Sequence, residues 1–169
     1  MKIIKIILSF LVLLVLCLGC GYYSFSGSSI PAHLKTVAIP IMDNKTVEFG
    51  VPEDLTDALI ALFTQDNSLK VVDRRSADSI IEGTIVNIRD QAGAYNQEET
   101  VKEIRVYVIV QAKYEDLKKN KMVWEEQITH WGTYNPDATS GDATTRQEAI
   151  AEALDKIVDD IFNKTVSGW

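Results

Sequence analysis

The chain has 169 residues, of which 46% are hydrophobic and 24% are charged, a composition typical of a folded domain rather than of a disordered chain. The 17 Lys and Arg residues are outnumbered by 24 Asp and Glu residues, which gives a net charge of -7 at pH 7. This charge would repel phosphate backbones, and no basic stripe with interleaved aromatic residues offsets it. We therefore expect no nucleic-acid partner.

The N-terminus has the pattern of a secretory signal. Two lysines precede an apolar run over residues 6–18, which is shorter than the roughly 18–20 residues a helix needs to cross a bilayer. Cys20 follows the small residue Gly19, and this ending resembles the lipobox of bacterial lipoproteins, in which the cysteine is acylated and becomes the mature N-terminus. We predict a lipoprotein signal peptide over residues 1–19 and lipidation at Cys20. An ordinary signal peptide or an N-terminal anchor helix is the alternative.

Both cysteines, Cys17 and Cys20, lie within or at the end of this signal. A domain exported to an oxidising compartment would then contain no disulfide, so its stability would depend on its hydrophobic core. The Gly- and Ser-rich stretch that follows predicts a lipidated N-terminus and flexible tether over residues 20–33. The remaining residues, 34–169, are enough for a single domain with a core of its own.

The first part of this domain alternates between strand and helix patterns. Residues 35–42 form a short β-branched run that predicts a largely buried strand, which Pro40 would place near a sheet edge or end. Pro52 favours a helix start, apolar residues spaced at i, i+3, i+4 and i+7 over residues 55–63 predict an amphipathic helix, and polar residues 66–68 are expected to end it. A brief apolar run follows at residues 69–72.

The second part predicts a long antiparallel hairpin and a second helix. Residues 79–89 have a strand pattern, and apolar and polar residues alternate most clearly over residues 104–114. Polar residues at 116–120 predict a turn, after which residues 122–131 return as the partner strand. A capping box begins a second amphipathic helix, which we expect over residues 145–164.

The predicted order of elements is strand, helix, strand, strand, strand, helix. Each predicted helix has one apolar stripe, and the clearest strand has one apolar face. Such elements must bury those surfaces against one another. We therefore predict an α+β fold, a two-layer sandwich in which two helices pack on a mostly antiparallel four-stranded sheet.

The sequence shows little sign of catalysis or cofactor binding. It has no Gly-rich phosphate loop, no zinc-ligand spacing and no Gly-x-Ser-x-Gly motif. The two histidines, His33 and His130, have no Cys or His at ligand spacing, so we expect no metal, no cofactor and no enzymatic activity. Lys118, Lys119 and Lys121 cluster at the predicted hairpin turn. They form either a solvated turn or a contact to an anionic group such as a lipid phosphate.

Several stretches of the sequence resemble the LPS-assembly lipoprotein LptE family. They are residues 20–25, 34–44, 55–63, 77–85 and 123–125. The resemblance implies two helices on a four-stranded sheet, anchored to the periplasmic face of the outer membrane by N-terminal acyl chains. It further implies that the protein is a plug and assembly partner of the LptD β-barrel and binds lipopolysaccharide, with Lys118, Lys119 and Lys121 as candidate contacts to its phosphates.

Two other functions remain open from the sequence. Outer-membrane lipoproteins that activate a peptidoglycan synthase, or assemble a secretion channel, share the strand-helix pattern of residues 37–63. The present chain differs from them because it ends soon after its second predicted helix. An envelope hydrolase is the other alternative, and only His33 and His130 could supply its imidazole base.

Overall fold

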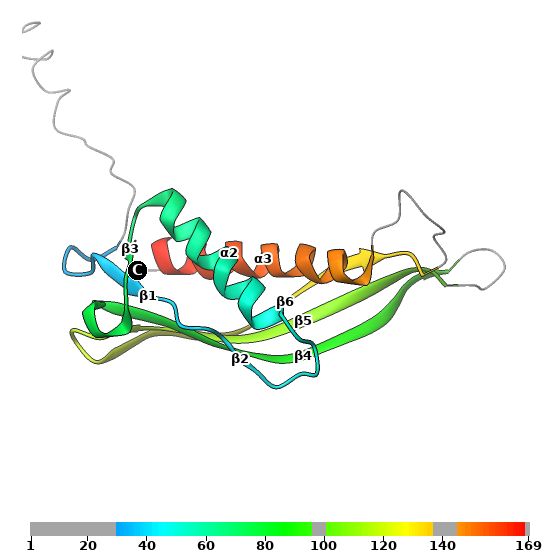
Figure 1. Ribbon diagram of the computed structural model, residues 1–169, viewed down its shortest axis with the longest axis horizontal. Helices are drawn as coiled ribbons and strands as arrows, with labels where there is room; N and C mark the ends of the chain where they lie inside the picture. The colour runs from blue at the N-terminus through cyan, green and yellow to red at the C-terminus, as the bar shows by residue number, and fades with distance from the viewer. Residues whose placement is uncertain (1–29, 96–100, 137–144, 168–169) are drawn as a thin grey trace, which may run out of the picture.

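The computed structural model describes residues 30–95, 101–136 and 145–167 of the chain. In these residues, two helices cover one face of a six-stranded mixed sheet (Figure 1). The strands are β1 (Thr36–Ala38), β2 (Asp43–Asn44), β3 (Lys70–Val71), β4 (Ser79–Tyr95), β5 (Val101–Asp116) and β6 (Lys121–Tyr134). The helices are α2 (Val51–Asp66) and α3 (Arg146–Ser167), with a short 3-10 helix η2 (Arg74–Ser76). The predicted α+β class is confirmed.

The sheet differs from the predicted one in strand number and direction. Its order is β3-β1-β4-β5-β6, and β2 also pairs with β4, so six strands replace the four predicted. The long strands β4, β5 and β6 are antiparallel, whereas the short strands β1, β2 and β3 all make parallel pairs. The prediction of a four-stranded, mostly antiparallel sheet is therefore corrected to a six-stranded mixed sheet.

Pro40 explains why the predicted strand over residues 35–42 is shortened to β1, with β2 lying just beyond its predicted end. Proline has no N–H to donate to a ladder, and the chain leaves the sheet at this point between β1 and β2. The N–H of Met42, which lies in this gap, instead donates to Oγ1 of Thr56 in α2 at 3.1 Å. A side chain of the helix thus satisfies a buried main-chain group that the sheet leaves unpaired.

Helix α2 confirms the predicted amphipathic helix, and it begins one residue before the predicted start at Pro52. Pro52 lies in its first turn, and Leu55, Leu59 and Phe63 are fully buried along one stripe. The helix ends at Asn67, whose φ of 59° is left-handed and whose N–H donates to the carbonyl of Phe63 at 3.0 Å. This is a C-terminal cap of the kind that asparagine tolerates.

The antiparallel hairpins are longer than the sequence predicted. Strand β4 continues to Tyr95, so residues 90–95, which follow the predicted strand over 79–89, also belong to the sheet, and residues 96–100 lie outside the described residues. Register shifts occur in the β4-β5 pair between Ile85 and Asn87 and again after Ala92. Because one face of this sheet has no helix over it, polar residues in β4 can point to solvent without ending the strand.

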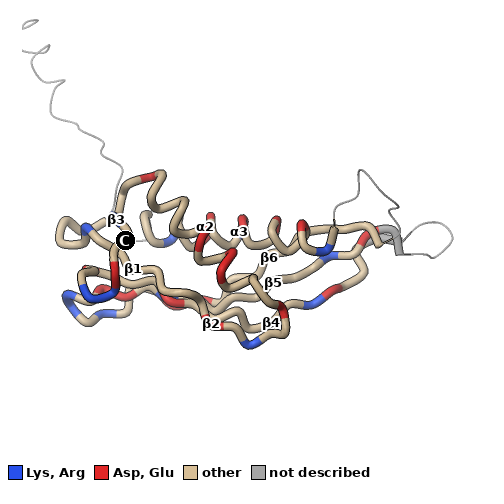
Figure 2. Tube along the Cα trace, viewed as in Figure 1, with Lys and Arg blue, Asp and Glu red and all other residues tan. Residues whose placement is uncertain are grey.

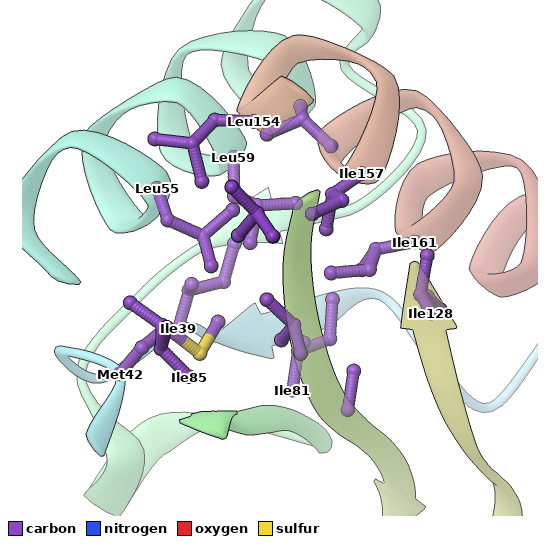
Figure 3. Close-up of a cluster of buried hydrophobic side chains, with 14 of the residues drawn as sticks. Ile39, Met42, Leu55, Leu59, Ile81, Ile85, Ile128, Leu154, Ile157 and Ile161 are labelled. Atoms are coloured by element: carbon purple, nitrogen blue, oxygen red, sulfur yellow. The ribbon is translucent and has the colours of Figure 1, made fainter. Parts of the chain in front are cut away.

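The core lies between the helices and the covered face of the sheet (Figure 3). Branched side chains of both layers meet there, and each buried one contributes roughly 1.5–3 kcal/mol relative to exposure. They include Leu55, Leu59, Ile81, Ile85, Ile128, Leu154, Ile157 and Ile161. The two helices also touch each other, with the rings of Phe63 and Phe162 packed edge to face at 5.0 Å. One contiguous core therefore joins all the long elements.

Helix α3 begins with the predicted capping box. The N–H of Thr145 donates to a carboxylate oxygen of Glu148 at 2.6 Å, and the N–H of Glu148 donates to Oγ1 of Thr145 at 3.2 Å. Neither of the two described helices is long and apolar enough to span a membrane. The predicted signal peptide over residues 1–19 and the predicted lipidation site Cys20 lie outside the described residues.

Candidate functional site

The three candidate lysines lie where the sequence placed them, at the turn between β5 and β6. Asn120 stands in this turn with a left-handed φ of 48°, which asparagine adopts more readily than most residues. Lys118, Lys119 and Lys121 are all exposed. Figure 2 shows blue segments gathered at the end of the molecule where β1 and β3 lie. The turn is thus a positive spot on an acidic protein.

Lys118 differs from the other two lysines because it is held by the protein itself. Its Nζ lies 2.8 Å from Oδ1 of Asp78 and 3.2 Å from the carbonyl oxygen of His33. Asp78 also accepts hydrogen bonds from the N–H groups of Lys35 at 2.8 Å and Thr36 at 3.1 Å. The hydrogen bond from Lys118, with that from Lys35, lowers the pKa of Asp78 to about 2. Lys118 therefore joins the start of the domain to the β5-β6 turn.

A second carboxylate ties the same segment to the turn. Oδ2 of Asp116 lies 2.7 Å from Nε2 of His33, and its Oδ1 accepts from the N–H of Lys119 at 3.0 Å. Burial alone would raise the pKa of Asp116, but the hydrogen bonds from His33 and from the main chain outweigh it and the pKa is lowered. Asp116 is therefore an ionised group inside the fold. Together with Asp78 it fixes the segment from His33 to Thr36, which spans the end of the predicted tether and the start of the predicted domain.

Lys119 and Lys121 are the side chains of the cluster that remain available. No ion pair involves either of them within the described ranges 30–95, 101–136 and 145–167, and both are exposed. Because they flank Asn120 on a tight turn, their ammonium groups can approach the same anion. This arrangement suits a phosphate contact at the surface more than a buried ligand site.

A polar pocket of about 440 Å³ opens beside β2 and β4. Its charged lining includes Arg74, Glu82, Lys113 and Glu125. Glu82 lies 2.9 Å from both Arg74 and Lys113, and the hydrogen bond from Lys113 is the largest cause that lowers its pKa. Arg74 and Lys113 are thus both paired with Glu82, and the pocket offers mainly hydrogen-bonding groups.

Each histidine pairs with an aspartate instead of gathering further ligands. His33 contacts Asp116, and His130 of β6 contacts Asp160 of α3 at 2.8 Å. Within the part of the chain that the structure describes, no three His, Cys, Asp or Glu side chains come together to hold a metal ion. The geometry therefore assigns both histidines to contacts between elements of the fold.

The fold and these sites define a class of small α+β domain, with helices on one sheet face and a charged turn at one end. The model of the LptE family, described as Lipopolysaccharide-assembly, matches residues 34–165. The chain belongs to this family, and the resemblance found in the sequence is confirmed. No curated protein matches the chain in sequence.

Solved structures share the fold at low sequence identity. A hypothetical protein from Chlamydia trachomatis is similar with a TM-score of 0.58 and 9% identity, covering 80% of this chain and 99% of its own. A minor lipoprotein from Acinetobacter baumannii has a TM-score of 0.51 and 16% identity, covering 82% and 94%. The rare lipoprotein B from Shewanella oneidensis has a TM-score of 0.51 and 14% identity, covering 76% and 92%.

Proposed function

We propose that this protein is an outer-membrane lipoprotein of lipopolysaccharide transport, which acts as plug and assembly partner of an LptD-like β-barrel and binds lipopolysaccharide. The observation that carries this proposal is the family match over residues 34–165, which covers almost all of the predicted domain. The function is one of contact rather than of catalysis, and it requires no cofactor.

Anchoring begins at Cys20, which carries the acyl chains once the signal peptide of residues 1–19 is removed. Acyl chains bind a membrane with about 0.8 kcal/mol per buried methylene, and stable attachment needs two signals. Residues 20–33 are the tether, and the domain that follows is residues 34–169. The contacts of Asp116 with His33 and of Asp78 with Lys35 support this division, because they hold the chain to the sheet at the predicted start of the domain. The protein then lies on the periplasmic side of the outer membrane.

The charged surface of the domain fits a place inside a large barrel. The interior of a transmembrane β-barrel is polar, in contrast to its lipid-facing outside. A plug with a net negative charge and ion-paired side chains suits such a lumen better than an apolar one. Barrel assembly would then use the same surfaces that later hold the plug in place.

Lipopolysaccharide binding is assigned to the turn of Lys118, Lys119 and Lys121. Lys119 and Lys121 present exposed ammonium groups to the lipid phosphates. Lys118 supports the turn through Asp78 and presents its half-exposed side chain beside them. The contact is local, because the rest of the surface is acidic and repels an anionic lipid.

Depletion of the protein in its own cells tests this function. We expect lipopolysaccharide to fall at the cell surface and the partner barrel to accumulate in a misassembled form. Complementation with the wild-type chain should restore both, and so should the double variant His33→Gln and His130→Gln, which keeps a hydrogen-bond donor for Asp116 and Asp160 but has no imidazole base. A normal level of surface lipopolysaccharide after depletion would refute the proposal. So would a histidine double variant that is folded and abundant but fails to restore surface lipopolysaccharide.

A further inference from the structure

Strand β6 is the outermost strand at one end of the sheet order. It runs over 14 residues, whereas β3 at the opposite end has only two. An edge strand carries main-chain N–H and C=O groups that no neighbouring strand satisfies, and a long one can accept a further strand. The question is which groups of β6 point away from β5.

The direction of the main-chain groups can be derived from one hydrogen bond at the other side of β4. The N–H of Lys45 donates to the carbonyl of Ile85 at 2.9 Å, so the main-chain groups of Ile85 face β2. Successive residues of a strand turn these groups to opposite sides, so those of Thr84 face β5. Thr84 stands opposite Gln111, and the groups of Gln111 therefore face β4.

The same alternation of main-chain direction, applied to β5, gives the direction of these groups in the edge strand β6. The groups of Val110 face β6, and Val110 stands opposite Ile128, so the groups of Ile128 face back to β5. The main-chain N–H and C=O groups of the odd-numbered residues on either side of Ile128 must then point away from β5. Glu125, Gln127 and Thr129 therefore present three N–H and three C=O groups on the free side of the sheet, and all three residues are exposed.

Helix α3 covers only the next part of this edge. Glu152 accepts a hydrogen bond from the N–H of Thr133 at 3.3 Å, and Nζ of Lys156 donates to the carbonyl of Trp131 at 2.9 Å. Both contacts involve odd-numbered residues, in agreement with the outward direction of their main-chain groups. Side chains of α3 thus satisfy the groups that a neighbouring strand would otherwise pair with. No comparable bond to the main chain of residues 125–129 is found within the described part of the chain. One half of the edge is thus closed and the other half is open.

The open half has an acidic border. Carboxylates lie on both sides of this edge. Glu126, Glu152 and Asp160 are at the contact between β6 and α3, whereas Glu125 is on the opposite face of the sheet, where it lines the polar pocket with Lys113. Lys156 pairs with Glu152 at 2.7 Å, and Lys164 pairs with Glu126 at 2.5 Å. Figure 2 shows further acidic positions along α3.

We propose that residues 125–129 of β6 are a docking site for an extended, basic segment of a partner protein, which adds to the sheet as a further antiparallel strand. Main-chain hydrogen bonds to Gln127 and its odd-numbered neighbours provide the contact, and the acidic border selects Lys or Arg on the incoming strand. A second copy of this chain is a poor occupant, because pairing β6 with itself would bring two acidic borders together. The site is separate from the lysine turn.

Amide hydrogen exchange of the mature protein, with and without a short synthetic peptide of alternating lysine and valine, tests this site. We expect exchange at the amides of Glu125, Gln127 and Thr129 to slow by about tenfold or more, as edge amides gain partners. Exchange at the amides of Glu126 and Ile128, which already face β5, should be unchanged. A peptide in which pairs of prolines separate the same number of lysines has the same charge, but its prolines fall on both edges of the strand and interrupt either ladder, so it should protect none of them.

Two variants at one position separate main-chain pairing from charge. Gln127→Pro removes an outward N–H without removing a bond to β5, and should abolish the protection, whereas Gln127→Ala keeps the N–H and should bind normally. If Gln127→Pro lowers the thermal stability, the wild-type protein still tests the proposal, because peptide binding should slow exchange at the odd-numbered amides of residues 125–129 and leave the even-numbered ones unchanged. Equal protection by both peptides, protection without the odd-even pattern, or protection that arises from self-association alone would overturn the proposal.

Discussion

Gly132 of β6 lies directly against the backbone of Ala149 in α3, so closely that a Cβ built on the glycine would come within 2.0 Å of the alanine carbonyl oxygen. Ala149 is fully buried, and the helix has no room to withdraw without losing its core contacts. We predict that Gly132→Ala lowers the free energy of unfolding by about 1–3 kcal/mol, the usual cost of forced overpacking. Chemical denaturation measures this.

Gly93→Ala is the matched control for that measurement. A Cβ at this position would come within 3.0 Å of Oε1 of Glu103 and 3.1 Å of Cγ and Nε of Arg105, all of them side-chain atoms and none of them backbone. The two substitutions add the same methyl group to β strands, so a difference in stability reports the helix contact alone. Equal stability of the two variants would contradict the close packing of α3 on β6.

Asp78 makes the stability of the protein depend on pH in the acid range. Its pKa is lowered from 3.8 to about 2, so the folded state holds this proton less tightly than the unfolded state does. The stabilisation is therefore complete above pH 3.8 and is lost as the pH falls through about 2. Asp78→Asn should lower the free energy of unfolding at pH 7 by about 1–3 kcal/mol and flatten its decline in this acid window. An unchanged acid profile in the variant would refute the role of the Lys118 contact.

Elements with a local sequence pattern were predicted correctly, whereas those that depend on contacts between distant residues were not. The stripe of Leu55, Leu59 and Phe63 and the alternation in β5 are local patterns, and they predicted α2 and the central hairpin correctly. The short strand β3 has only two residues, and its pairing with β1 depends on contacts more than thirty residues apart in sequence. No local pattern could show that it joins the sheet.

The candidate site was predicted only in part for the same reason. The cluster of Lys118, Lys119 and Lys121 is visible in the sequence because its members are neighbours. The contact of His33 with Asp116 joins residues 83 apart, and that of Lys118 with Asp78 joins the turn to a residue before β4. Two lone polar residues carry no sequence signal of their pairing. The structure therefore adds a structural role for Lys118 that the sequence did not indicate.

Charge reversal tests the proposed lipid contact. We predict that Lys119→Glu combined with Lys121→Glu weakens lipopolysaccharide binding about tenfold, since each removes an attraction to phosphate and adds a repulsion. Because neither ammonium group is paired within the described residues, thermal stability should change little. Lysine-to-glutamine changes at the same positions are the milder control and should give an intermediate loss. Binding that is unaffected by either pair would leave the turn as a solvated one.

Cys20→Ala tests the proposed anchor. The variant lacks the thiol that receives the acyl chains, so we predict an unprocessed or soluble protein that does not reach the outer membrane. Membrane fractionation with mass spectrometry of the N-terminus measures both properties. An acylated variant, or correct sorting without acylation, would show that the anchor lies elsewhere.

The proposed partnership with a barrel is tested by capture of the full-length protein from detergent-solubilised outer membranes, followed by identification of the proteins bound to it. We expect a large β-barrel protein of the LptD kind to be recovered in stoichiometric amount, together with lipopolysaccharide. Recovery of a peptidoglycan synthase or a secretion channel in its place would contradict the proposed partnership.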